Sequence, residues 1–206
     1  MEVYILDRNY YDRLIDEYEY DAYSDHPFEG ESTFATDIMG PWEIELPKII
    51  YCRADFRFIH NTDYPCVDIC TDSVFSKKIF DVILNLSELN YRSVPVIMVD
   101  DTYPDDPLRE DGTLKDEVKR EEYVAVQLMD SVNAFDHDNS EYDNSHIFPG
   151  EVGNIHKLVL KEPEGGFPSI FRIKEQGHMF VSSQAKEALV KAGIKGCEFK
   201  PVEVSS

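Results

Sequence analysis

The chain has 206 residues, of which 41 are Asp or Glu and 20 are Lys or Arg, so its formal net charge is −21. Nucleic-acid binders place Lys and Arg on phosphates, so this charge excludes a basic nucleic-acid binder and disfavours docking on anionic lipid. Because 42% of the residues are hydrophobic and 12% are aromatic, we expect a folded, strongly acidic protein.

The sequence carries no sign of a membrane span or a secretory signal. The longest apolar runs, such as Val94–Val99, are far shorter than the roughly 18 residues of a spanning helix. The N-terminus has an acid at position 2 and no basic segment followed by an apolar core. Four cysteines are too few for a disulfide scaffold in a chain of this length. We therefore expect a cytoplasmic protein with reduced thiols.

In the first half of the chain the pattern predicts strands and helices in alternation. Val3–Leu6 is a short apolar run typical of a strand, and residues 10–18 are long enough for one or two helical turns. A helix is predicted from Asp72, its N-cap candidate, to Leu86, because apolar residues recur there at helical spacing. Val94–Val99 is predicted to be a strand, and the acidic loop after it contains two prolines.

The second half predicts several short strands and one helix. The strand-like pieces are 123–128, 132–135, 158–160, 170–173 and 196–202, with a Gly165-Gly166 turn before the fourth. Ser182 and Ser183 are N-cap candidates for a helix that ends near Gly193, at a position where a left-handed residue is expected. The class is therefore α+β, with a mixed or mostly antiparallel sheet and a few helices.

The negative charge is unevenly distributed along the chain. Residues 1–155 contain 35 acids and 12 bases, whereas residues 156–206 contain 6 acids and 8 bases. Three segments hold most of the excess, namely 1–31, 100–122 and 130–143, and the first of them includes six tyrosines. The acidic surface is therefore expected to lie on the first three quarters of the protein.

No motif in the chain predicts a catalytic or metal centre. Cys66 and Cys70 are four residues apart, but a second ligand pair at zinc-site spacing is missing, so buried thiols are favoured. The run from Asp136 resembles the start of a calcium loop, but Glu141 and Ile147 occupy positions that require Gly and Glu. The six histidines occur in no catalytic spacing. We predict no catalytic residue, metal or cofactor.

Three stretches of the sequence carry a recognisable pattern. They are residues 123–142, with a D-x-x-x-S-x-Y element at Asp136, Ser140 and Tyr142; residues 168–175, PSIFRIKE; and residues 180–202, FVSSQAKEALVKAGIKGCEFKPV. In this order they resemble the Imm11 immunity protein family of bacterial polymorphic toxin systems. Trp42, Leu46-Pro47 and the helix from Asp72 also follow the family's order, whereas Lys195 stands where threonine is common. A single domain over 1–206 is expected, with a variable N-terminal part (about 1–50) and a C-terminal part carrying the motifs (about 120–206).

The resemblance implies that the protein binds a cognate toxin domain in the cytoplasm and neutralises it without catalysis. A toxin that acts on nucleic acid or nucleotides presents a basic cleft, which an acidic partner can fill with carboxylates. We expect contacts from segments 7–25, 100–111 and 136–143. The candidate residues are Tyr11, Asp12, Asp16, Tyr18, Tyr20, Asp100, Asp101, Asp105, Asp106, Asp136, Asp138, Glu141, Tyr142 and Asp143.

Simpler interpretations compete with each of these assignments. Any one acidic segment is more often a solvated loop than a contact surface. Asp136, Ser140 and Tyr142 fit a turn that caps backbone amides better than they fit a partner contact. Phe171 and Arg172 fit core packing and a buried ion pair. Two other functions stay open, a hydrolase that uses the Asp136–Asp143 carboxylates with a histidine, and an acidic adaptor without a toxin.

Overall fold

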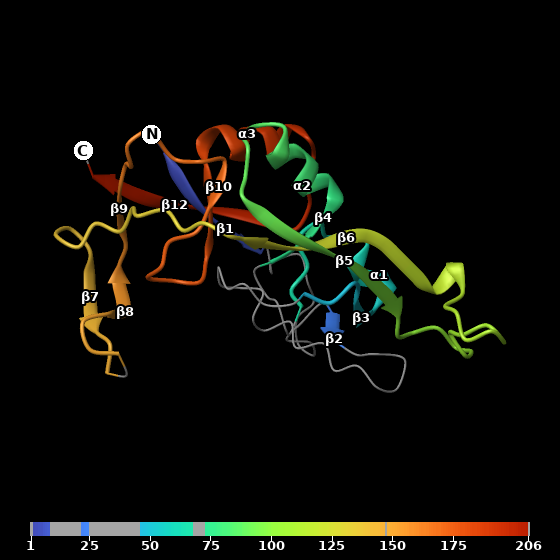
Figure 1. Cartoon of the computed structure of the whole chain (residues 1–206). Coiled ribbons are helices and arrows are strands. Elements are labelled where there is room, and N and C mark those ends of the chain that lie inside the picture. The colour runs from blue at the N-terminus through green and yellow to red at the C-terminus, as the bar shows by residue number, and fades with distance from the viewer. Residues whose placement is uncertain (1, 9–21, 25–45, 68–72, 147, 206) are drawn as a thin grey trace.

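The computed structural model of the chain describes residues 2–8, 22–24, 46–67, 73–146 and 148–205 (Figure 1). Mixed β-sheets and a few helices make up this part of the chain, as the α+β prediction requires, and strands predominate. The predicted helical turns at residues 10–18 lie outside the described residues. Within the described ranges, no helix has the length and apolar character needed to cross a membrane.

The first of the two larger sheets in the described residues has the strand order β10-β11-β1-β12-β9. The middle strand, β1, comes from the N-terminus of the chain and pairs antiparallel with β11 and β12, while the edge strand β9 runs parallel to β12. The bounds are β1 Val3–Arg8, β9 Val159–Lys161, β10 Ile170–Phe171, β11 Met179–Ser182 and β12 Cys197–Ser205. The sheet therefore joins the two ends of the sequence.

The second large sheet has the order β2-β3-β5-β6-β4. Its long strands β5 and β6 form an antiparallel pair, β3 runs parallel to β5, and β4 pairs antiparallel with β6. The bounds are β2 Ala22–Ser24, β3 Ile50–Ala54, β4 Val74–Ser76, β5 Tyr91–Asp100 and β6 Lys119–Leu128. A separate two-stranded ribbon contains β7 Glu141–Asn144 and β8 Val152–Lys157.

The two large sheets repeat one arrangement of strands and helix. In the second sheet, β4 and β5 are joined by helix α2 (Lys77–Leu84), and β6 lies between them, antiparallel to both. In the first sheet, β11 and β12 are joined by helix α3 (Ser183–Lys191), and β1 lies between them in the same way. Each unit also has a parallel neighbour strand, β3 beside β5 and β9 beside β12.

Both helices begin at a serine that ends the preceding strand. The Ser76 hydroxyl accepts a hydrogen bond from the Ile79 amide at 3.2 Å, and the Ser182 hydroxyl accepts one from the Ala185 amide at 3.3 Å. The predicted start of α3 at Ser182 and its predicted end near Gly193 are therefore confirmed. For α2 the predicted start was wrong, because residues 74–76 form β4 and the helix begins five residues after Asp72, itself outside the described residues.

Other predicted strands are confirmed in type, with differences in length. Val3–Leu6, 94–99, 123–128 and the C-terminal strand lie within β1, β5, β6 and β12. The predicted strand at 132–135 was wrong, because only Phe135 makes a bridge, to Leu160, while the Val132 amide bonds to the Arg172 carbonyl. The Gly165-Gly166 turn is present, with a 3.0 Å hydrogen bond from the Gly166 amide to the Pro163 carbonyl.

A shared core holds the two sheets together between the helices. Alternate residues of β6 face opposite sides, so Val124, Val126 and Leu128 pack with both helices and with Leu6 and Val181 of the first sheet. On the other side of β6, a second core includes Tyr123, Ala125 and the inward residues of β3 and β5. In Figure 1 the helices α2 and α3 lie side by side over the strands of the two sheets.

Backbone contacts also join the loop after α3 to the turn after α1 (Phe56–Ile59). The Asp63 amide donates to the Lys195 carbonyl at 3.0 Å, and the Lys195 amide donates to the Asp63 carboxylate at 2.8 Å. Lys78 donates to the Gly193 carbonyl at 3.0 Å. The loop after α3, which contains Gly193 and Gly196, therefore connects the half of the protein around the first sheet to the half around the second sheet.

Candidate partner-binding site

The structure describes only part of the predicted contact surface. Tyr11, Asp12, Asp16, Tyr18 and Tyr20 lie outside the described residues. The two remaining segments lie at opposite ends of the molecule, the first between β5 and β6 and the second at the base of the β7–β8 ribbon (Figure 1). The predicted residues therefore do not form one continuous site in the described part of the chain.

The connection between β5 and β6, residues 101–118, projects from the end of the second sheet, and we call it the acidic tip (Figure 1). A small apolar cluster lies beneath it, in which Val99, Leu114 and Val118 are buried and Tyr103 and Leu108 are partly buried. Buried side chains under a long loop hold its backbone in one conformation, because their burial offsets the conformational entropy that is lost when the loop is ordered. The acidic tip is therefore an ordered loop that is packed on an apolar cluster.

Hydrogen bonds close the tip into a small hairpin. The Arg109 amide donates to the Thr113 carbonyl at 2.7 Å, and the Lys115 amide donates to the Pro107 carbonyl at 3.0 Å. The Asp106 carboxylate accepts from the Leu108 amide at 2.9 Å, and the Asp111 carboxylate accepts from the Thr113 amide at 3.0 Å. These side-chain caps hold the turns, so the tip presents its remaining carboxylates in a fixed arrangement.

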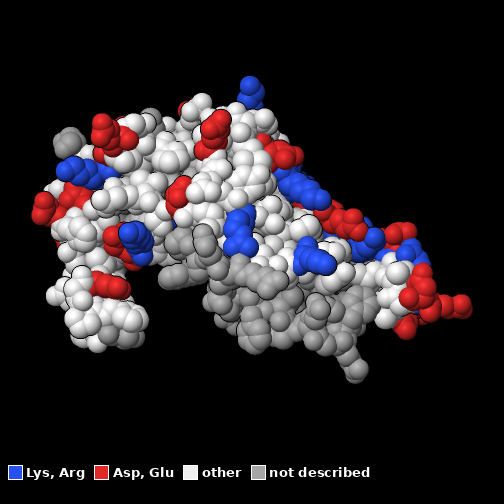
Figure 2. Space-filling view, viewed as in Figure 1, with Lys and Arg blue, Asp and Glu red and all other residues white. Residues whose placement is uncertain are grey.

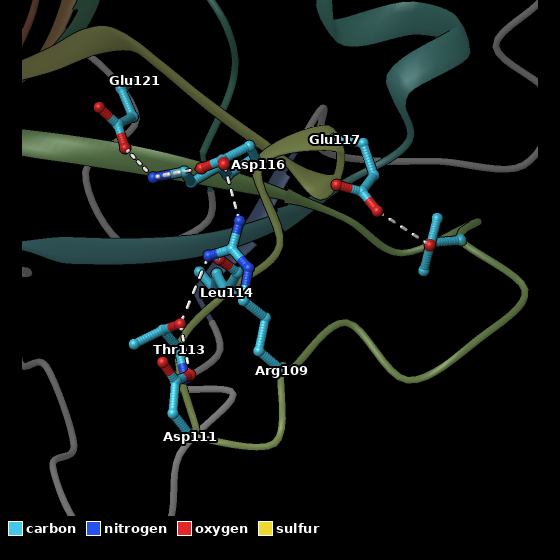
Figure 3. A network of polar contacts seen from close by, with 9 residues as sticks. Arg109, Asp111, Thr113, Leu114, Asp116, Glu117 and Glu121 are labelled. Carbon is cyan, nitrogen blue, oxygen red and sulfur yellow. Dashed lines mark hydrogen bonds and ion pairs between the residues drawn. The ribbon is translucent and has the colours of Figure 1, made fainter.

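The basic side chains of this region are engaged in local contacts (Figure 3). Arg109 contacts Asp116 at 2.7 Å, and this ion pair lowers the pKa of the Asp116 carboxyl. Lys119 contacts Glu121 at 2.6 Å and Asp116 at 3.5 Å. Lys115 lies 5.2 Å from the centre of the Tyr103 ring. The two cations of the tip, Arg109 and Lys115, therefore have local partners, an ion pair for the first and an aromatic ring for the second.

Several carboxylates of the tip have no such partner. Asp105, Asp106 and Glu110 are exposed, and among the described residues none of them makes an ion pair. Partial desolvation, followed by the neighbouring carboxylates of Asp55 and Asp100, raises the pKa of Asp101, while Arg53 and Arg57 act in the opposite direction. At this end of the molecule, Figure 2 shows acidic side chains outermost.

Asp100, like Asp106 and Asp111, stabilises the loop by accepting a backbone hydrogen bond. Its carboxylate accepts hydrogen bonds from the Thr102 amide at 3.0 Å and from the Thr102 hydroxyl at 2.7 Å. The side chain is half-buried at the end of β5. Of the four predicted residues in this segment, the exposed ones are Asp101, Asp105 and Asp106.

The segment 136–143 forms the turn that its pattern favours. The Asp136 carboxylate is 7% exposed and accepts hydrogen bonds from the Asp138 amide at 3.0 Å, the Asn139 amide at 3.1 Å and the Asn139 side chain at 2.8 Å. The Ser140 hydroxyl bonds to the carbonyl and amide of Val159. Hydrogen bonds from the Ser205 hydroxyl, the Asn139 side chain and the turn amides lower the pKa of Asp136 to about 2.

Tyr142 completes this turn by packing. Its ring lies edge to face with the rings of Phe135 and His137, at centroid distances of 5.4 Å and 5.7 Å. Its hydroxyl lies 3.1 Å from the His137 Nδ1 atom. The D-x-x-x-S-x-Y element therefore fastens the β7–β8 ribbon to the first sheet. Asp138, Glu141 and Asp143 are exposed around it.

The second family-like stretch also serves packing. Phe171 is buried and its ring stacks between those of Phe167 and Phe180, at centroid distances of 5.2 Å and 5.3 Å. Arg172 is half-buried, and its carbonyl accepts the Val132 amide at 2.7 Å. This stretch therefore contributes to the core of the first sheet.

The described thiols are poorly placed for chemistry. Cys52 and Cys66 are buried, and burial raises the pKa of the partly exposed Cys197 thiol to about 12. A thiol with such a pKa is almost entirely protonated at neutral pH and is a weak nucleophile. In the described ranges, no three His, Cys, Asp or Glu side chains are grouped so that they could hold a metal ion. Cys70 lies outside those ranges.

Two exposed residues, Glu110 and Phe148, were not predicted from the sequence as contact residues. Glu110 was within a predicted segment but was not named, and its exposure depends on the turn that the Gly112 amide closes on the Arg109 carbonyl at 2.9 Å. Phe148, at the end of the β7–β8 ribbon, is 58% exposed. The sequence signal for it was the apolar run Ile147-Phe148-Pro149 within an otherwise polar segment.

Part of the chain matches the model of a known protein family. No curated protein is similar enough to the chain to serve as a relative. Residues 109–204, which include β6, the ribbon, α3 and most of β12, match the immunity protein family Imm11. The resemblance found in the sequence is thus confirmed over this region, where the chain is similar to the Imm11 immunity protein family.

Proposed function

We propose that this protein acts in the cytoplasm by binding a cognate toxin domain in a one-to-one complex, and that the acidic tip covers a basic active site on the toxin. The observation that carries the proposal is the set of carboxylates, Asp105, Asp106 and Glu110, that are exposed and make no ion pair among the described residues, on a loop whose own cations have local partners. The similarity of residues 109–204 to an immunity protein family supplies the class of partner.

The arrangement of the tip favours fast and specific binding. Uncompensated charge at the end of a projecting loop attracts a basic partner and can raise the association rate by orders of magnitude at low ionic strength. The tip is already ordered by Leu114 and Val118, so binding does not have to pay for fixing its backbone. Carboxylates held in this way can occupy positions that the phosphates of a substrate would take.

The test compares two triple variants that change the net charge equally. The first, Asp105→Asn/Asp106→Asn/Glu110→Gln, removes the unpaired carboxylates of the tip. The second, Glu88→Gln/Glu164→Gln/Glu187→Gln, removes three exposed acids on other elements. The binding partner is the toxin domain encoded beside this chain, purified as an inactive variant, and association rates are measured by stopped-flow fluorescence at several salt concentrations.

We expect the tip variant to associate about 10-fold more slowly at low salt, with a weaker dependence on salt. The control variant should stay within about 2-fold of wild type, because its charges are not part of the contact. Equal losses in the two variants would show that only the total charge matters, and the proposed contact surface would then be wrong.

A hydrolase that reverses the toxin's modification is the main alternative, and stoichiometry separates it from a binder. A binding inhibitor protects a toxin's target only near one equivalent, whereas an enzyme protects at trace amounts. Protection is therefore titrated against a fixed amount of toxin. Full protection at about a hundredth of an equivalent would contradict the binding mechanism. An adaptor function would instead be favoured if no toxin gene adjoins the gene for this chain.

A further inference from the structure

The β7–β8 ribbon, residues 141–157, projects from the first sheet, and we call it the arm (Figure 1). Tyr142 and Ile155, and Val152 at the turn end of β8, pack against one apolar cluster that includes Phe135. Among the described residues, its two strands pair with each other and with no other strand. A two-stranded ribbon has little stability of its own in water, so the order of the strands depends on this cluster, and only the turn between them lies beyond it.

The end of the arm is a closed turn that presents Phe148. The Ser145 amide donates to the Glu151 carbonyl at 2.9 Å, and the Glu151 amide donates to the Phe148 carbonyl at 3.1 Å. The Phe148 amide is capped by the Ser145 hydroxyl at 3.0 Å. These three bonds connect Ser145, Phe148 and Glu151, and the side chain of Phe148 is 58% exposed.

The exposure of Phe148 differs from that of the other large exposed apolar residues described, Phe58 and Val190. Phe58 lies on α1 with the Arg57 guanidinium 5.5 Å from its ring centre, and Val190 lies on α3 among Lys and Glu residues. Single exposed apolar residues on the body of a protein are ordinary. Phe148 instead occupies the turn of a projecting hairpin, where polar residues are the rule.

The edges of the arm are poorly suited to adding a strand from another protein. The pairing of β7 with β8 shifts register on both sides of Tyr142. Gly153 lies so close to β7 that a Cβ atom there would be 3.0 Å from the Asn144 carbonyl oxygen. Irregular pairing of this kind twists a ribbon and interrupts the regular array of edge groups. Contact through the turn is therefore favoured over contact through an edge.

The charge of the arm indicates the kind of partner. Residues 141–157 contain three acids and one base, so the arm has a small negative net charge. Asp143 lies 3.1 Å from His156 across the ribbon, and Glu141 and Glu151 are exposed. A pocket that accepts the phenyl ring should therefore have a basic rim.

We propose that Phe148 is an aromatic anchor that inserts into an apolar pocket with a basic rim on the toxin domain. This inference rests on the proposed function, since it takes the same partner, and it adds a second contact at the opposite end of the molecule from the acidic tip. The tip sets the association rate through charge, and the anchor sets the dissociation rate by burying a ring.

The experiment measures the affinity of the same inactive toxin domain for three proteins, namely wild type, Phe148→Ala and the control Val190→Ala. The control removes an apolar side chain of similar exposure from α3. We expect Phe148→Ala to raise Kd about 30-fold, mainly by faster dissociation, as truncation of an interface anchor does. Val190→Ala should leave Kd unchanged, and Phe148→Leu should recover part of the loss.

The outcomes separate this inference from the proposed function. If wild type binds and Phe148→Ala binds equally well, the anchor is wrong and the proposed function stands. If wild type does not bind the toxin domain at all, the proposed function fails and the anchor fails with it. Thermal denaturation of each variant checks the fold, and because Phe148 is exposed its truncation should leave the melting temperature unchanged.

Discussion

Replacing Gly196 by alanine tests the contact between the two halves of the protein. Gly196 has φ +76°, in the left-handed region. A Cβ atom built on it would lie 2.1 Å from the Thr62 Oγ1 atom and 2.9 Å from the Thr62 Cβ atom. Thr62 is 9% exposed, and its hydroxyl accepts the Tyr64 amide at 3.1 Å. Rotating the Thr62 side chain would lose this bond and would still leave the two Cβ atoms in collision.

The cost has two parts that can be separated. A non-glycine residue in the left-handed region costs about 1 kcal/mol. Forcing an extra carbon into a filled contact costs about 1–3 kcal/mol more. Gly193 provides the matched control, because its φ is +67° but nothing lies within 4 Å of its Cβ position. We therefore expect Gly196→Ala to lower the free energy of unfolding by about 2–4 kcal/mol and Gly193→Ala by about 1 kcal/mol.

Urea denaturation followed by far-UV circular dichroism measures both values. A double-mutant cycle with Thr62→Gly assigns the steric part, since that change removes both colliding atoms. In the Thr62→Gly background, Gly196→Ala should cost only about the 1 kcal/mol of backbone strain. If Gly196→Ala costs no more than Gly193→Ala, or if its cost is the same in both backgrounds, the close approach to Thr62 does not stabilise the fold.

Two further predictions concern the first sheet. Because the pKa of Asp136 falls from 3.8 to about 2 on folding, its carboxylate stabilises the native state above about pH 4 and this contribution is lost as the pH falls toward 2. The difference in melting temperature between wild type and Asp136→Asn should therefore shrink over that range, and a constant difference would contradict the assignment. A fragment of residues 109–206 should fail to fold because it lacks β1, while a permuted chain that links residue 206 to residue 2 and starts at residue 109 should show native circular dichroism.

Local signals in the sequence were sufficient for the helices and for the long strands. Ser182 and Gly193 define the two ends of α3 because capping depends on residues within one turn of the helix. The start of α2 was harder to predict. Val74 and Phe75 fit a helical spacing as well as a strand, and their pairing with Ala125 and Val124 of β6 decides the outcome. Such long-range pairing leaves no local pattern in the sequence.

The order of the strands in the sheets could not be predicted from the sequence, because it too depends on long-range pairing. The placement of β1 between β11 and β12 joins residues nearly 200 positions apart, such as Val3 and Val202. β3 was not predicted, although Ile50, Cys52 and Ala54 alternate as a half-buried strand does. The arm was missed because β7 and β8 are polar, so hydrophobic alternation gives no signal for them.

For the candidate site, the sequence indicated where acids concentrate but could not distinguish their roles. Asp100, Asp106 and Asp136 all accept backbone hydrogen bonds in turns, whereas Asp105 has no such contact among the described residues. Whether a carboxylate caps a turn or remains available depends on the backbone around it. The acidic composition therefore predicts a kind of partner, and only the fold can show which carboxylates are free to meet it.

The region that matches the immunity family is smaller than the unit that folds. Residues 109–204 contain β9, β10, β11 and most of β12, but the first sheet has β1 in its middle. They also contain β6, whose neighbours β4 and β5 lie outside the match. Both repeated units therefore draw strands from outside the matched region. The acidic tip and the arm are carried by these two units, one each, so their separation is fixed only when the whole chain is folded. A partner that contacts both would thus recognise the complete protein and not an isolated segment of it.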